Sequence, residues 1–171
     1  MKKMIAGLVI LGLLTPVLLR AAQQPVEIKR VRSAAAQSPI LAGVVVPPGA
    51  TYVYLSGQVP AAADASKPAE TAEAYGDTKT QAVSALNKIK GLLADQNLSL
   101  GDVIKLTVYL VGDPTKGGKL DFKGFSDAYA QFFGTPGQPN LVARTTVQVV
   151  ALANPGFLVE IDAIAAKIEH P

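Results

Sequence analysis

The chain has 171 residues, of which 49% are apolar, and a formal net charge of +3. This length suits one ordinary domain, and this apolar content with so small a charge excludes a disordered chain. There is no cysteine, and the one histidine, His170, lies beside the C-terminus, which excludes disulfides, thiol nucleophiles, zinc–thiolate or histidine metal sites and Ser-His-Asp catalysis.

Residues 1–22 have the pattern of a secretory signal peptide, with a basic start, an uncharged run over 4–19 and two small residues, Ala21 and Ala22. We therefore expect an exported protein, periplasmic or secreted, with its domain over 23–171; an uncleaved leader would instead tether it to the membrane. Without the three basic residues of the leader, 13 basic residues balance 13 acidic ones. A net charge of zero argues against nucleic-acid binding.

The first part of the domain reads as β-structure. Residues 26–31 alternate apolar and polar side chains, as a half-buried strand does. Two further β-rich runs, 40–46 and 51–55, flank the turn sequence PPGA at 47–50. We expect these two runs to form a hairpin that ends at Ser56-Gly57-Gln58.

Two helices and one strand are expected next. Apolar residues recur at three- and four-residue spacing from Asp77 to about Gln96, which predicts an amphipathic helix with Asp77 as its N-cap. Residues 103–111 predict a strand buried on both faces. A second helix is predicted from about 121 to 133, with an aromatic stripe that is more typical of a core than of a binding surface: Phe122, Phe125, Tyr129, Phe132 and Phe133.

The chain ends in two predicted strands, 142–152 and 157–166, joined by the turn sequence ANPG. The order of elements predicts an α+β fold in which one sheet carries two helices on one face. No third helix remains for the other face, so we expect other copies of the chain to cover it.

Two charges interrupt the last strands. Strand alternation places Arg144 on one face with Thr146, and Glu160 stands alone among apolar residues. One interpretation is a structural ion pair that involves one or both of them. A C-terminal hairpin would leave these two residues about 20 Å apart, which favours the other interpretation, a site for a small anion between subunits. Ser56, beside Gly57, and the hydroxyls of Thr145 and Thr146 offer further polar groups.

Several motifs together resemble the Rid family, the reactive intermediate (enamine/imine) deaminases. They are LSGQVP (55–60), ALNKIKGLL (85–93), GDVIKLTVYL (101–110), FSDAYAQFFG (125–134), ARTTVQVVAL (143–152) and LVEIDAIAA (158–166). The resemblance implies a chorismate-mutase-like fold and a homotrimer with clefts between its subunits. It also implies hydrolysis of 2-imino or enamino acids to 2-keto acids and ammonia, without metal or cofactor.

The resemblance also assigns roles to residues. It implies that Arg144 binds the substrate carboxylate and that Glu160 activates water, while Ser56, Gly57, Thr145 and Thr146 line the cleft. One departure is that a tyrosine usual in deaminating members is absent, and Gly43 or a neighbour stands in its place. The alternative is therefore a non-catalytic trimer that binds a small carboxylate or a partner protein. RNA cleavage, attached to some relatives, is disfavoured by the zero charge and the lack of a catalytic histidine.

Overall fold

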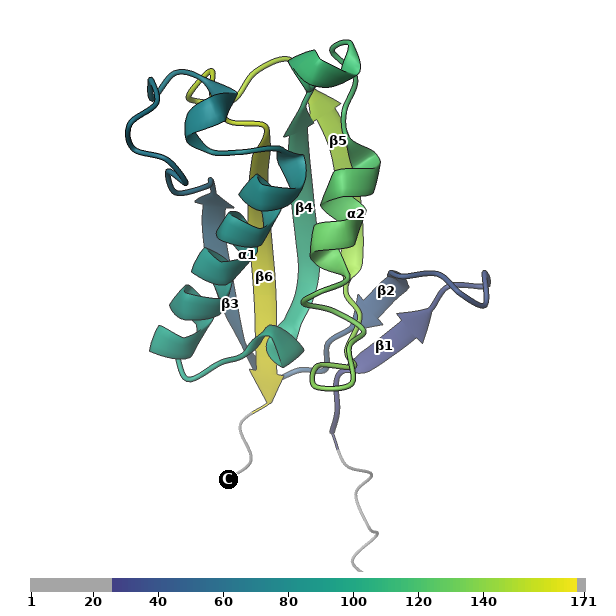
Figure 1. Ribbon diagram of the computed structural model, residues 1–171. Helices are drawn as coiled ribbons and strands as arrows, with labels where there is room; N and C mark the ends of the chain where they lie inside the picture. The colour runs from purple at the N-terminus through teal and green to yellow at the C-terminus, as the bar shows by residue number, and fades with distance from the viewer. Residues whose placement is uncertain (1–25, 169–171) are drawn as a thin grey trace, which may run out of the picture.

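The computed structural model describes residues 26–168, so the predicted leader and His170 lie outside the described residues. A single six-stranded mixed sheet carries two helices on one face, which confirms the predicted α+β architecture (Figure 1). Its strands run in the order β1 (Lys29–Arg32), β2 (Leu41–Val45), β5 (Ala143–Val149), β4 (Val103–Val111), β6 (Val159–Ile168) and β3 (Ala50–Gln58).

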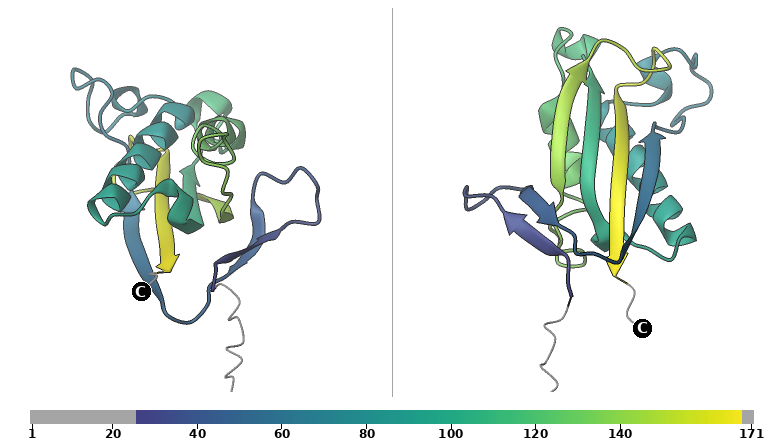
Figure 2. Two further views of the ribbon diagram at one scale, coloured as in Figure 1. Left: turned by 90° about the horizontal axis from the view of Figure 1, so that it is seen from below. Right: turned by 180° about the vertical axis from the view of Figure 1, so that it is seen from behind.

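The predicted hairpin between β2 and β3 is wrong. Strand β2 pairs antiparallel with β1, whereas β3 pairs antiparallel with β6 at the opposite edge of the sheet. Pro47 and Pro48 each have a fixed φ and no amide donor, and Pro48 and Gly49 form a turn in which Gly49 has a φ of 85°. The link therefore carries the chain past one end of the sheet instead of reversing it beside β2 (Figure 2).

The predicted C-terminal hairpin is also wrong, because β4 lies between β5 and β6. Strand β4 runs parallel to β5 and antiparallel to β6. Its side chains Leu106, Val108 and Leu110 are fully buried, so β4 takes the centre of the sheet and each C-terminal strand pairs with it. Residues 150–158 connect the end of β5 to the start of β6.

Helix α1 (Thr78–Asp95) follows the predicted span, and the Asp77 carboxylate accepts a hydrogen bond of 2.8 Å from the Thr80 amide. Helix α2 (Phe122–Tyr129) is shorter than predicted, because residues 130–133 continue as turns. Short 3-10 turns complete the described secondary structure: η1 (Ala72–Ala74), η2 (Leu100–Asp102) and η3 (Pro114–Lys116). Within residues 26–168, no helix combines the length and the apolar character that crossing a membrane requires.

The core lies between the helices and one face of the sheet. Leu86 and Ile89 of α1 and Phe125 of α2 are fully buried against the sheet. Most residues of the aromatic stripe lie in the core, as the sequence predicted. No helix or strand of residues 26–168 covers the other face (Figure 2). There Tyr54 is 71% exposed and Val147 is 41% exposed. We call this surface the open face.

The N-cap of α1 yields a test of the fold. Replacing Asp77 with Ala is expected to lower the free energy of unfolding by about 1 kcal/mol at neutral pH. The hydrogen bond from the Thr80 amide lowers the pKa of Asp77 below its usual 3.8. The stabilisation is therefore present above the unfolded-state pKa and is lost as the pH falls through the folded-state pKa. Urea unfolding of both proteins at neutral and strongly acidic pH measures this, and Glu70→Ala, in an exposed loop, is the control.

Candidate functional site

Arg144 lies among aromatic rings, and two of its nitrogen atoms have no hydrogen-bond partner among the described residues. It sits on β5 and points to the helix side of the sheet, since its register partner on β4 is the buried Leu106. Its guanidinium carbon lies 4.5 Å from the ring centroid of Tyr129, 5.0 Å from that of Phe125 and 5.8 Å from that of Phe122. The Nε and Nη1 atoms are buried and make no hydrogen bond to any described residue.

A second half-buried arginine, Arg30 of β1, behaves in the opposite way. Its Nη1 donates to the carbonyls of Val103 at 2.9 Å and Leu141 at 2.7 Å, and its Nη2 donates to that of Gly101 at 2.7 Å. Arg30 therefore ties β1 to the start of β4 with its own donors. Of these two arginines, only Arg144 has buried donor atoms without a hydrogen-bond partner among the described residues.

The charge of Arg144 is desolvated but not neutralised. Burial lowers the pKa of Arg144 from its usual value, and the nearby Tyr129 opposes that effect. No Asp or Glu of the described chain forms an ion pair with it. Aromatic faces attract a guanidinium through their quadrupole and leave its in-plane N–H groups free. This is the arrangement that suits a bidentate carboxylate.

Thr146 lies two residues along β5 on the same face as Arg144, and its hydroxyl oxygen is also buried without a partner. Beyond Leu41, which pairs with Ala143, β2 does not continue beside β5, so most of the outer edge of β5 is unpaired in the described chain. Unpaired buried polar groups beside an unpaired strand edge indicate a surface that is completed by something outside the chain.

Glu160 lies on β6, close to Ser56 and Gly57. A register shift in β3 sets both of these residues opposite Asp162, as a β-bulge. A Cβ atom at Gly57 would overlap the Glu160 carboxylate, so the glycine makes room for that carboxylate against the backbone. Ser56 is exposed beside it.

The chain leading into Glu160 is held from α1. The buried Gln81 donates to the Gly156 carbonyl at 3.0 Å and accepts from the Leu158 amide at 2.7 Å. These bonds fix both sides of the turn before β6 and hence the start of the strand that carries Glu160.

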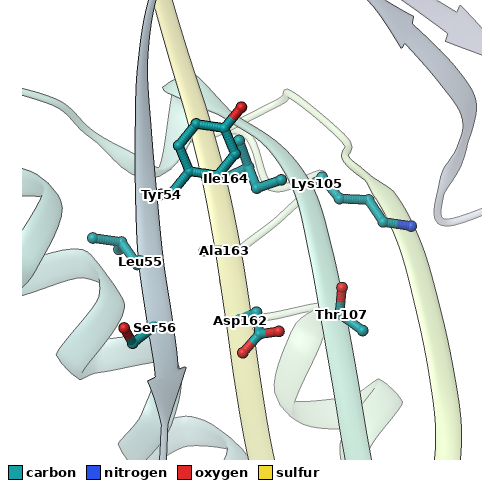
Figure 3. A pocket seen from close by; sticks show the side chains of 8 residues that line it. All are labelled: Tyr54, Leu55, Ser56, Lys105, Thr107, Asp162, Ala163 and Ile164. Atoms are coloured by element: carbon teal, nitrogen blue, oxygen red, sulfur yellow. The ribbon is translucent and has the colours of Figure 1, made fainter.

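The open face next to Glu160 carries further polar side chains that the sequence did not single out. The Tyr109 hydroxyl donates to Asp162 at 3.2 Å, and the negative charge of Asp162 raises the pKa of Tyr109. Lys105 donates to the Thr145 hydroxyl at 2.7 Å. A hollow of about 330 Å³ lies on this face. Three of its lining side chains, Ser56, Thr107 and Asp162, project from three neighbouring strands (Figure 3).

The structure does not bring Arg144 and Glu160 together in one chain. Through β4, Arg144 pairs with Leu106, whereas Glu160 pairs with Tyr109. Because Leu106 and Tyr109 are an odd number of residues apart, the two charges lie on opposite faces of the sheet. Thr146 therefore accompanies Arg144, Ser56 and Gly57 accompany Glu160, and Thr145 lies on the open face. An ion pair between Arg144 and Glu160 of the same chain is excluded by this geometry.

The aromatic surroundings of Arg144 were the main feature missed from the sequence. The signal was present, since Phe122, Phe125 and Tyr129 follow at three- and four-residue spacing on one face of α2. Nothing in the spacing says that an arginine lies against them. Within the described residues, no three side chains from His, Cys, Asp and Glu gather closely enough to hold a metal ion.

Comparison with known proteins gives consistent results. The family model described as Endoribonuclease L-PSP matches residues 44–167. A RutC family protein of Pyrococcus horikoshii is 35% identical over 116 residues, which cover 68% of this chain and 79% of the relative. TdcF of Escherichia coli K12, named as a proposed reactive intermediate deaminase, is 32% identical over 117 residues, covering 68% of this chain and 80% of TdcF.

Solved structures show the same fold. A protein of unknown function of the conserved Rid family, YyfB of Yersinia pestis, superposes with a TM-score of 0.61 at 22% identity, over 82% of this chain and 98% of its own. A protein of unknown function from Pseudomonas aeruginosa superposes with a TM-score of 0.53 at 30% identity, over 81% of this chain and 92% of its own. The chorismate-mutase-like fold expected from the sequence is thereby confirmed.

The two arginines give a test of which one serves the fold. Arg144→Met keeps an apolar stem against the rings. It removes two unsatisfied donors but also the attraction between the cation and three rings, and because these effects oppose each other the free energy of unfolding should stay within about 1 kcal/mol of the wild-type value. Arg30→Met, the matched control, removes three hydrogen bonds and should cost on the order of 3 kcal/mol. Denaturant unfolding without ligand compares them. An Arg144 variant destabilised as much as the Arg30 variant would assign Arg144 a structural role instead.

Proposed function

This chain belongs to the Rid family, and we propose that it hydrolyses 2-imino acids and their enamino tautomers to 2-keto acids and ammonia. The observation that carries the proposal is the desolvated guanidinium of Arg144, whose Nε and Nη1 have no hydrogen-bond partner within residues 26–168. The name of TdcF supports the reaction class. No metal or cofactor is needed for this reaction.

In the proposed reaction Arg144 binds the substrate carboxylate. A planar guanidinium forms two parallel hydrogen bonds to a carboxylate, and these bonds are strong where water is excluded. The bound carboxylate would neutralise the charge of Arg144, which forms no ion pair among the described residues. The Thr146 hydroxyl, two residues further on the same face, would supply an additional hydrogen bond to the ligand.

Glu160 is proposed to act on water. A carboxylate that accepts a proton from water raises the nucleophilicity of the oxygen, which then attacks the C2 carbon of the imine. The C–N bond breaks after the nitrogen is protonated, ammonia leaves, and the oxygen of the water becomes the keto oxygen. The place that Gly57 leaves for the carboxylate is consistent with a defined position for this group.

Because Arg144 and Glu160 lie on opposite faces of one sheet, we propose that the site forms between the Arg144 of one chain and the Glu160 of its neighbour. A homotrimer supplies three such sites. The open face, with its exposed Tyr54 and Val147, and the unpaired outer edge of β5 are the surfaces that such an assembly would cover. We propose that the assembly acts after export, in keeping with the leader pattern of residues 1–22.

The absence of a tyrosine near Gly43 favours a second candidate, a trimer that binds a small carboxylate without hydrolysing an imine. In the structure Gly43 lies in β2, and a Cβ there would meet no atom within 4 Å, so no other side chain of the described residues fills that position. The two candidates share Arg144 and differ only in turnover.

The first test measures hydrolysis of 2-imino acids that an amino-acid oxidase generates in the assay. The protein should release ammonia faster than buffer alone does. Glu160→Gln should lower kcat by about 10²-fold or more. Arg144→Met should lower kcat/KM by at least roughly thirtyfold, because it removes a buried charge partner of the carboxylate.

Arg32→Met, which removes an exposed arginine of β1, is the control and should leave the rate unchanged. Wild-type protein that gives only the buffer rate would contradict the deaminase proposal. Thermal stabilisation by 2-keto acids without turnover, lost in Arg144→Met, would then favour the carboxylate-binding candidate.

The second test concerns the assembly. Light scattering on the mature protein should give about three times the mass of one chain. Val147→Lys places a charge on the open face, where burial would leave it without a partner, and should dissociate the trimer. Leu92→Lys changes a partly exposed apolar residue of α1 in the same way and should leave the trimer intact. A wild-type monomer at micromolar concentration is the result that would count against the inter-subunit site.

A further inference from the structure

The three rings around Arg144 differ in their exposure. Phe125 and Tyr129 are buried in the core, whereas Phe122 is 49% exposed. All three lie within 5.8 Å of the guanidinium carbon, measured to the ring centroids. The two buried rings therefore form the floor under Arg144, and Phe122 forms the rim that solvent reaches.

The floor is fixed from several sides. The Tyr129 hydroxyl donates to the Pro39 carbonyl at 3.1 Å, and its ring stacks on that of Phe133 with centroids 4.9 Å apart. A rigid floor holds the guanidinium in one place. Phe122 has no such second function in the core, because about half of its surface faces outward at the first turn of α2. An exposed phenylalanine held beside an unpaired cation calls for a ligand that has both an acidic and an apolar part.

We infer that Phe122 sets the side-chain preference of the proposed deaminase: its exposed ring contacts the apolar side chain of an imino acid whose carboxylate is bound to Arg144. This inference rests on the proposed function. A carboxylate bound to a guanidinium has N–O distances of about 2.8 Å, which leaves the atoms beyond C2 within van der Waals reach of a ring as near as Phe122. The substrate class is therefore 2-imino acids with branched or aromatic apolar side chains.

The charges beside Phe122 support an apolar rim. Lys116 pairs with Asp121 at 3.4 Å, and Lys123 pairs with Asp127 at 2.6 Å. The four charged side chains of these two pairs therefore have partners already. A substrate with a charged side chain would lose water against the Phe122 ring without gaining an ion pair, so the rim selects against it.

The experiment compares imines generated from alanine, leucine, phenylalanine and glutamate. The wild-type protein should have a kcat/KM about tenfold higher for the leucine or phenylalanine imine than for the alanine imine, and lowest for the glutamate imine. Phe122→Ala should remove this preference through KM, so that kcat/KM for the leucine and phenylalanine imines falls to that for the alanine imine. Phe122→Leu, which keeps an apolar side chain, should retain part of the preference.

Leu92→Ala removes an exposed apolar side chain from α1 and is the matched control, with the wild-type preference expected. Circular dichroism and melting temperature show that each variant folds. Equal preferences in the wild-type and Phe122→Ala proteins, or a wild-type preference for the charged side chain, would overturn the inference.

A binding measurement separates this inference from the proposed catalysis. Calorimetry with the product acids pyruvate, 4-methyl-2-oxopentanoate, phenylpyruvate and 2-oxoglutarate requires no turnover. Tighter binding of the two apolar acids that depends on Phe122 supports the inference even if no imine is hydrolysed, in which case only the catalytic proposal fails. Hydrolysis of every imine with affinities that do not depend on Phe122 overturns the inference and leaves the proposed function in place.

Discussion

The interaction on which the candidate site depends is the packing of the Arg144 guanidinium against Phe125 and Tyr129 without an acid partner. Aromatic faces compensate part of the lost hydration of a cation but accept none of its in-plane hydrogen bonds. Two buried donors therefore stay unsatisfied, at a cost of about 1–3 kcal/mol each. Arg30 shows that the same fold can satisfy an arginine fully with carbonyls. By contrast, the donors of Arg144 are positioned for a hydrogen-bond acceptor that the described chain does not contain.

The position of β4 decides how such a site can be completed. Because β4 separates β5 from β6, the strand that carries the cation and the strand that carries Glu160 never pair, and the register turns their side chains to opposite faces. Relaxation of side chains cannot bring them together across a sheet. A site that uses both groups must therefore take them from different chains. The bare open face and the unpaired edge of β5 follow from the same topology, since neither is covered by an element of the chain.

Local patterns in the sequence were enough for most elements and not for their pairing. The periodicity of α1 and the apolar run of β4 predicted both spans closely, because helix and strand periods act within a few residues. Both predicted hairpins were wrong, because strand pairing depends on the whole sheet and not on neighbouring residues. The link at Pro47-Pro48 leads to β3 at the far edge, and the buried β4 pairs with both C-terminal strands. The separation of Arg144 from Glu160 was predicted correctly, but from a hairpin that does not exist. Arg144 and Glu160 do not meet because their side chains point to opposite faces of the sheet.

The bulge at Ser56-Gly57 and the aromatic surroundings of Arg144 share one physical property: each weakens the fold locally. The bulge interrupts the hydrogen-bond ladder with β6, and the surroundings of Arg144 leave two of its donor atoms unpaired. Neither feature improves the packing of the core. Gly57 is explained by the Glu160 carboxylate, which occupies the space that a Cβ atom would need. The half-exposed Phe122 is explained by the Arg144 cation beside its ring. Features that cost stability persist when a function requires them. Here they occur at Arg144 and Glu160, and contacts made by Gln81 and Tyr129 help to hold the structure around these two residues in place.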